Sequence, residues 1–226
     1  MFFWRISPTF AGMGHKKLIR FNAIKEFANV LEYPEGMAGN WKEFFRNENP
    51  LVLELACGKG EYTVGLARLH QQMNHLGVDV KGNRIYAGAK KALQEGLGNA
   101  AFLRTQIDRI SEYFGPAEVG EIWITFPDPQ LRISRAKKRL THPKFLRLYQ
   151  RFLKPGGSIH LKTDSPALYL FTKRVIDMHG LELQEDIEDL YAQTALTPEL
   201  EIKTYYESLD IAQEIRHHAE ACGVKP

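Results

Sequence analysis

Hydrophobic residues beyond position 50 follow two alternating patterns. Short apolar blocks bounded by proline or glycine predict strands. The predicted strands are residues 51–56, 75–79, 101–104, 121–126, 158–163 and 204–206. Between most of these blocks, apolar residues recur every three or four positions, which is typical of helices with one buried face. The predicted helices are residues 62–72, 85–95, 143–154 and 168–179.

Strands that alternate with helices predict an α/β fold, with a parallel sheet covered by helices on both faces. Right-handed crossover connections place the carboxyl ends of the strands at one edge of the sheet. Ligands of such open sheets bind at that edge. Asp79, Asp128 and Asp164 follow the ends of different strands, and Glu54 lies within the first one. We therefore expect these acids to converge on one crevice.

The first 49 residues lack this regularity. A short basic patch occupies residues 14–20, and proline, glycine and asparagine interrupt residues 34–40. We therefore expect an N-terminal basic extension over residues 1–49 and one domain over residues 50–226.

The composition suits a globular protein with its own core, because 44% of the 226 residues are hydrophobic and 25% are charged. No run of about 18 apolar residues is present, which argues against a membrane-spanning helix. Arg5 interrupts the N-terminal apolar residues too early for a secretory signal. The two cysteines, Cys57 and Cys222, lie far apart, as suits a reducing compartment. We expect a cytoplasmic protein without a membrane partner or a metal, and a monomer or a homodimer.

Positive charge is concentrated in one segment, although the net charge of the chain is only +3. Residues 131–154 hold nine of the 30 basic residues and no acidic one, so the rest of the chain is acidic. Such a segment indicates a docking surface for a polyanion. The alternative is an ordinary solvated helix face.

The segment from Glu54 to Gly60, with the sequence ELACGKG, follows the first predicted strand and precedes a helix. Gly58 and Gly60 allow the backbone to pass close to a ligand. Asp79 ends the next strand, where a carboxylate can accept both hydroxyls of a ribose. Together these features indicate an adenosine-type cofactor site. The dinucleotide pattern GxGxxG is absent, because Thr63 stands where its third glycine would be. A tight structural turn with a surface aspartate is the alternative.

The segment Phe126-Pro-Asp128-Pro129 follows the fourth predicted strand of the domain. Two prolines restrict the backbone on both sides of Asp128 and hold its carboxylate at the ligand edge of the sheet. A simple turn would explain the same residue types. The basic segment that follows favours a binding site instead.

These motifs together resemble those of bacterial tRNA (guanine-N7-)-methyltransferases. The similarity covers roughly residues 13–209: the ELACGKG turn, the aspartate after the second strand, FPDP with its basic run, LKPGG, KTD, and the TYYE of residues 204–207. FPDP with the basic run and TYYE are the specific part. The resemblance implies a Rossmann-like S-adenosylmethionine methyltransferase fold with a mostly parallel seven-stranded sheet whose last strands include an antiparallel pair. It also implies methylation of guanine N7 in tRNA, usually at guanine-46 of the variable loop.

The resemblance also implies roles for individual residues. Asp128 matches the catalytic acid. The residues implied to bind the cofactor are Glu54, Gly58, Gly60, Asp79, Gln106 and Asp128, with Asp108 as the alternative to Gln106. The residues implied to bind the guanine or the RNA are Arg132, Arg135, Lys137, Lys138, Arg139, Asp164, Thr204, Tyr205, Tyr206 and Glu207.

The chain departs from the family pattern after FPDP. Gln130 and Arg132 stand where the family often has tryptophan and lysine. Arginine is not equivalent to lysine, because its planar fork binds phosphate and base edges differently from a point charge. Three other functions remain possible at this point. They are an S-adenosylmethionine enzyme with another substrate, a nicotinamide-dependent oxidoreductase, and an RNA-binding module without activity.

Overall fold

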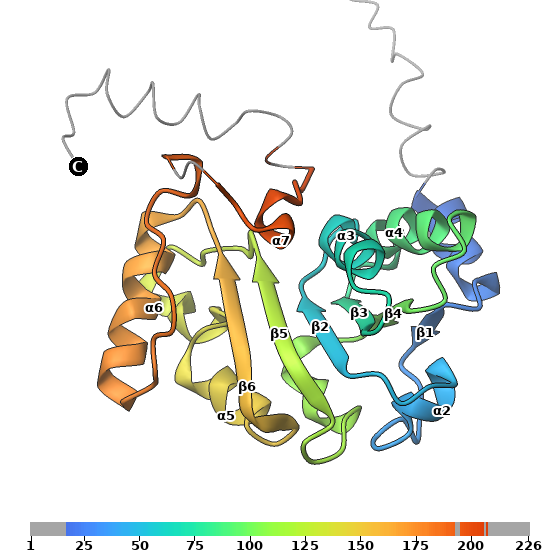
Figure 1. The fold of residues 1–226 in the computed structure, drawn as a ribbon, viewed down its shortest axis with the longest axis horizontal. Helices are drawn as coiled ribbons and strands as arrows, with labels where there is room; N and C mark the ends of the chain where they lie inside the picture. The colour runs from blue at the N-terminus through green and yellow to red at the C-terminus, as the bar shows by residue number, and fades with distance from the viewer. Residues whose placement is uncertain (1–16, 193–194, 206, 208–226) are drawn as a thin grey trace, which may run out of the picture.

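The computed structural model describes residues 17–192, 195–205 and 207, and it forms one sheet with helices on both faces (Figure 1). The strands are β1 (Val30–Glu32), β2 (Leu51–Leu55), β3 (Asn74–Asp79), β4 (Ala100–Arg104), β5 (Val119–Thr125) and β6 (Leu153–Lys162). The helices are α2 (Trp41–Phe45), α3 (Glu61–Leu69), α4 (Gly82–Gln94), α5 (Pro143–Tyr149), α6 (Pro166–His179) and α7 (Pro198–Glu201). Short 3-10 helices are η1 (Ile24–Glu26), η2 (Ile107–Glu112), η3 (Ile133–Lys138) and η4 (Leu190–Ala192).

The strand order is β1-β4-β3-β2-β5-β6, and every neighbouring pair is parallel. The α/β prediction is therefore confirmed. Because all the strands run in the same direction, the residues that follow β2, β3, β5 and β6 lie along one edge of the sheet.

Side chains of β2 point alternately to the two faces of the sheet. Leu53 and Leu55 join the larger core, to which α5 and α2 contribute aromatic residues such as Phe145 and Trp41. On the opposite face, α3 and α4 pack over β3 and β4 (Figure 1). The core on this face includes Val64, Ile85 and Phe102. Strands buried on both faces explain why the sequence shows continuous apolar blocks there.

The described residues contain six strands, one fewer than predicted. Thr204 and Tyr205 are not in a strand, and Tyr206 lies outside the described residues. No antiparallel pair occurs among the described strands. The prediction of a late strand at residues 204–205 is wrong, because these residues form a turn tied by side chains, as described below.

Two further boundaries differ from the predictions. Helix α5 ends at Tyr149 rather than Lys154, and β6 already begins at Leu153. Pro155 explains this, because the residue before a proline is biased toward an extended backbone. The Pro-Gly-Gly segment after Lys154 lies within β6 as an irregularity in its pairing with β5, where Val119 pairs with Leu153 and Glu121 with Ser158.

Residues 24–45, which the sequence assigned to an N-terminal extension, pack into the domain. Strand β1 pairs with β4 at the edge of the sheet. Ile24 and Trp41 are fully or almost fully buried, and the Trp41 indole N–H donates to the Tyr113 carbonyl over 2.8 Å. The structured body therefore begins well before residue 50, although apolar periodicity there is too short to reveal it. Residues 1–16 lie outside the described part.

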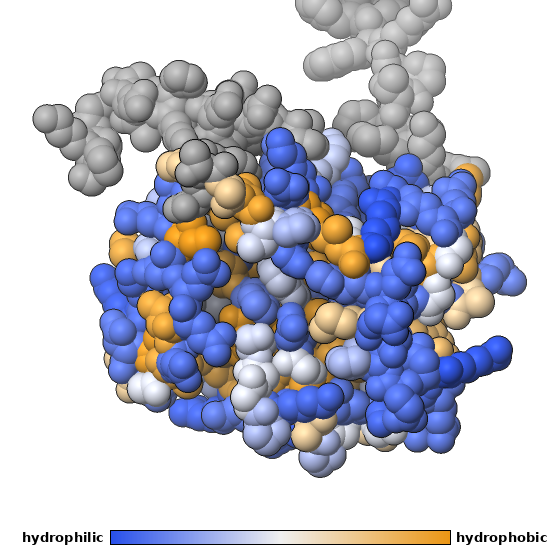
Figure 2. All heavy atoms as spheres, viewed as in Figure 1, coloured by the Kyte–Doolittle hydropathy of each residue, from blue (hydrophilic) through white to orange (hydrophobic). Residues whose placement is uncertain are grey.

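Hydrophilic residues cover most of the face that carries α3 and α7, and apolar residues show between them (Figure 2). Every helix in the described part of the chain is too short or too polar to cross a lipid bilayer.

Candidate functional site

The turn between β2 and α3, residues 56–60, has a left-handed backbone at alternate residues, and we call it the glycine turn. Ala56, Gly58 and Gly60 have φ values of 59°, 57° and 73°. A Cβ on Gly58 would meet nothing closer than the Ala56 carbonyl at 4.0 Å, whereas one on Gly60 would lie 2.4 Å from the Phe102 ring. Gly58 therefore keeps space open at the turn, and Gly60 is required for close packing between α3 and the sheet.

Gly60→Ala should lower the free energy of unfolding by about 2 kcal/mol or more, since it combines an unfavourable φ with overpacking against Phe102. Gly58→Ala is the matched control: it has the same backbone strain without the collision, and should lower the value by only about 1 kcal/mol. Urea unfolding of both variants measures the difference. Equal losses would contradict the packing role of Gly60.

Asp79 joins the end of β3 to this turn. Its Oδ2 accepts from the Gly58 N–H over 3.0 Å, and its Oδ1 accepts from the Lys81 N–H over 2.8 Å. A carboxylate oxygen has more than one acceptor site. Asp79 can therefore hold the turn and still accept hydroxyl groups of a bound ribose.

Glu54 lies beneath the turn rather than in an open site. Only 3% of the residue is exposed, and its Oε2 accepts from the backbone N–H and the hydroxyl of Thr63 over 2.7 and 2.5 Å. Its Oε1 accepts from the Thr125 hydroxyl over 2.8 Å. Burial raises the pKa of Glu54 to about 7, although these hydrogen bonds oppose the rise. Glu54 therefore fastens the first turn of α3 to the end of β5.

Thr63 and Thr125 belong to the candidate site through their bonds to Glu54, and the sequence analysis missed them. Thr63 was considered only as a departure from a glycine pattern, and Thr125 as part of an apolar strand. The one available signal was Glu54 itself, because an acid inside a continuous apolar strand needs hydrogen-bond donors near it.

Asp128 follows β5 in a strained loop. Phe126 and Gln130, on either side of the Pro-Asp-Pro segment, have φ values of 45° and 46°. The exposed Asp128 accepts from the Gln130 N–H over 3.0 Å. Non-glycine residues in this region cost of order 1–3 kcal/mol and concentrate at functional sites. Residues 128–132 and Arg135 line a hollow of about 340 Å³.

The basic segment lies next to this acid, mostly on η3 and α5. Arg132, Arg135, Lys137 and Lys138 are exposed. Arg139 differs from them, because its guanidinium donates to the Pro129 and Gln130 carbonyls over 3.2 and 3.3 Å and lies 4.5 Å from the centre of the Phe171 ring. Arg139 thus stabilises the loop of Asp128.

The two candidates after β4 have different surroundings. Gln106 is exposed and directly precedes η2. Asp108 forms an ion pair with Lys144 of α5. Of these two residues, Asp108 is therefore the one whose carboxylate is already paired with a cation.

Asp164 is exposed just after β6. Thr204 and Glu207 bond to each other: the Thr204 N–H donates to Glu207 over 2.8 Å, and the Glu207 N–H donates to the Thr204 hydroxyl over 3.3 Å. This reciprocal pattern is a capping box. Tyr205 lies between them in the sequence, and its ring is 2.9 Å from the Lys59 Nζ of the glycine turn.

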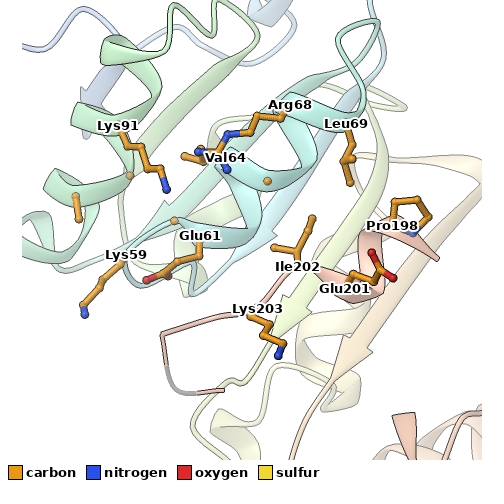
Figure 3. Close-up of a pocket in the computed structure, with 14 residues that line it drawn as sticks. Lys59, Glu61, Val64, Arg68, Leu69, Lys91, Pro198, Glu201, Ile202 and Lys203 are labelled. Carbon is orange, nitrogen blue, oxygen red and sulfur yellow. The ribbon is translucent and has the colours of Figure 1, made fainter. Parts of the chain in front are cut away.

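The predicted acids share one edge of the sheet but not one cavity. Asp79 ends β3, and Asp128 and Asp164 follow β5 and β6 at the same edge, with β2 between β3 and β5. Glu54, within β2, is enclosed beside Thr63 and Thr125. A second hollow, of about 470 Å³, lies between α3, α4 and α7 and includes Lys59 and Gly60 but none of these four acids (Figure 3). In the part of the chain described, no group of three or more potential metal ligands comes together.

Comparison with known proteins assigns this chain to a family. Residues 48–217 match the family model described as "Putative methyltransferase". The tRNA (guanine-N(7)-)-methyltransferase of Porphyromonas gingivalis is 47% identical over 81% of this chain and 80% of its own length. The chain belongs to the tRNA (guanine-N(7)-)-methyltransferase family. The family member of Christiangramia forsetii is 45% identical over 87% of this chain and 92% of its own length.

A solved structure agrees with this assignment at the level of the fold. An antibiotic-related methyltransferase superposes with a TM-score of 0.51 and 15% identity, over 68% of this chain and 84% of that one. The predicted methyltransferase fold and the predicted family are therefore confirmed.

Proposed function

We propose that this protein transfers a methyl group from S-adenosylmethionine to N7 of a guanine in tRNA, at position 46 of the variable loop. The observation that carries the proposal is the extensive identity to relatives named for guanine-N7 methylation of tRNA, at 45–47% over most of the chain. The exposed Asp128 supports it, because the exposed Arg132 and Arg135 line the same hollow.

The residues at the sheet edge fit an adenosine-type cofactor. The space above Gly58 is free of side chains, and the Asp79 carboxylate sits beside it at the end of β3. S-adenosylmethionine, when bound, supplies a methyl group attached to a positively charged sulfur. We propose Gly58, Gly60, Asp79 and Gln106 as residues that hold it, with Asp128 at the boundary toward the guanine. Glu54 would act from beneath, by holding the turn.

Methyl transfer to guanine N7 depends mainly on how the two reactants are oriented. Guanine N7 carries a free lone pair, so no base has to remove a proton from it before the new N–C bond forms. Holding the two reactants in line can lower the activation free energy by on the order of 7–11 kcal/mol at best. The methylated base gains a positive charge, and a carboxylate that accepts from its N1–H and amino edge would stabilise this charge as it develops. We assign this role to Asp128 and Asp164, whose side chains are exposed after β5 and β6.

Replacing Arg135, Lys137 and Lys138 together by alanine should weaken tRNA binding. The slope of log affinity against log salt should become shallower by about 2–3, because each lost phosphate contact reduces its magnitude by roughly 0.7–0.9. Alanine at the exposed Lys42, Lys90 and Arg174 makes a control of equal charge. Fluorescence anisotropy with labelled tRNA measures both. A wild-type affinity that stays flat between about 50 and 200 mM salt would contradict the electrostatic docking.

The function is tested with labelled S-adenosylmethionine and unmodified tRNA transcripts, followed by nuclease digestion and mass spectrometry. We expect 7-methylguanosine in the normal transcript and none in a transcript with adenine at position 46. Label that persists in the second transcript would reject the position. Label on another base, or no label, would reject the activity.

A further inference from the structure

Lys162, the last residue of β6, has a side chain that is only 9% exposed. Its Nζ donates to the Leu200 and Ile202 carbonyls over 3.0 and 3.3 Å and forms an ion pair with Oε1 of Glu207 at 2.8 Å. An ammonium group has three N–H donors, and these three acceptors match that number. All three acceptors belong to the C-terminal segment, which we define as residues 198–205 and 207.

The C-terminal segment is folded around this contact. Glu207 is buried with 3% of its side chain exposed, and its other oxygen accepts from the Thr204 N–H in the capping box. Ile202 packs so closely on α3 that a Cβ added to Gly65 would lie 2.8 Å from it. Figure 3 shows Ile202 and Lys203 beside the first turns of α3.

The same ammonium also adjoins both parts of the candidate site. Its Nζ lies 5.7 Å from the ring centre of Phe126, which begins the loop of Asp128, and 5.4 Å from that of Tyr62 in α3. Tyr205 of the C-terminal segment contacts Lys59 in the glycine turn. Lys162 thus lies where the C-terminal segment, the start of α3 and the Asp128 loop meet.

We infer that Lys162 is a positioning residue, which fastens the C-terminal segment beside the Asp128 loop so that the target guanine is held in line for transfer. This inference rests on the proposed function. Thr204 and Glu207 serve the fastening through their capping box and ion pair, and they present Tyr205 at the glycine turn. The motif implied to touch the guanine therefore acts in part through Lys162.

Lys162→Met keeps most of the length of the side chain and removes its charge. Amide hydrogen exchange in the C-terminal segment should become about tenfold faster or more, because the buried Glu207 carboxylate loses its ion pair with Lys162. The single-turnover rate at saturating tRNA and cofactor should fall about 100-fold, the effect expected of misplaced reactants. The affinity for tRNA should change by less than about twofold, since phosphate contacts of the basic segment supply most of it.

Two further variants make the result decisive. Lys42→Met removes an exposed lysine that is also paired with a glutamate, Glu48, and should leave exchange and rate unchanged. Lys162→Met with Glu207→Gln removes both charges of the ion pair, so this double variant should melt near the wild-type temperature. It should still show fast exchange and slow transfer, because the contacts to the Leu200 and Ile202 carbonyls are gone.

Exchange in Lys162→Met as slow as in Lys42→Met would overturn the fastening role. Fast exchange with a wild-type transfer rate would overturn the positioning role, and so would full recovery of both quantities in the double variant. If the wild-type protein methylates no tRNA, the proposed function fails, and the positioning role fails with it. The exchange comparison needs no substrate and still supports or overturns the fastening.

Discussion

Asp128→Ala should reduce methyl transfer to tRNA about 100- to 1,000-fold, the loss typical of removing one group that stabilises developing charge. Binding of S-adenosylmethionine should remain, because Asp79 and the glycine turn lie on other strands. The expectation follows from the placement of Asp128 as an exposed carboxylate in a strained loop, with Arg132 and Arg135 lining the same hollow.

Asp128 also shapes its own loop, so a second substitution has to separate shape from charge. Its Oδ1 accepts from the Gln130 N–H, and the amide oxygen of Asp128→Asn can accept the same bond. A charge role requires that both variants lose the rate. Single-turnover kinetics and calorimetric titration with the cofactor measure the two effects.

Asp177→Ala, on the exposed part of α6, is the matched control and should keep the full rate. Full activity of Asp128→Asn beside an inactive Asp128→Ala would assign Asp128 a purely structural role. Full activity of both would remove it from the reaction.

The arrangement of the sheet could be predicted from sequence because its central strands are buried on both faces. Such strands appear as continuous apolar blocks, and helices between them dictate parallel pairing. The positions of Asp79, Asp128 and Asp164 at one edge follow from that geometry. In contrast, β1 is only three residues long and partly buried, so no pattern marks it.

The roles of individual side chains could not be predicted in the same way. Arg139 looks like its basic neighbours in the sequence, yet it bonds to the Asp128 loop. Lys162 and Glu207 are 45 residues apart and meet only because the C-terminal segment returns to the end of β6. Contacts of this kind depend on tertiary packing, which neither periodicity nor motif spacing encodes.

Glu54 shows both what the sequence could predict and what it could not. Its position between Leu53 and Leu55, in a strand buried on both faces, makes its burial predictable. The resemblance to the family instead assigned it to the cofactor. In the structure its carboxyl group is surrounded by Thr63 and Thr125.

The free energy of unfolding of Glu54→Gln, minus that of wild type, should be about 3 kcal/mol larger at pH 8 than at pH 4.5. This value follows from roughly 1.4 kcal/mol per pKa unit. The ordinary pKa of a glutamate is 4.5, and burial raises that of Glu54 to about 7. Between these values the unfolded chain has lost the proton and the folded protein still holds it, so wild-type stability falls as pH rises. Above about pH 7 both states are ionised and the folded protein bears the full cost.

The glutamine side chain can replace the protonated acid without a charge. Its oxygen can accept from Thr63 and its amide can donate to the Thr125 hydroxyl, so the fastening of α3 to β5 should persist. Urea unfolding between pH 4.5 and 8 measures the free energy of unfolding of both proteins, with the exposed Glu182→Gln as the control that should follow wild type. A difference between Glu54→Gln and wild type that stays constant across this range would mean that Glu54 is already ionised in the folded protein. Glu54 would then be free to act as a charged cofactor ligand, contrary to its enclosed position.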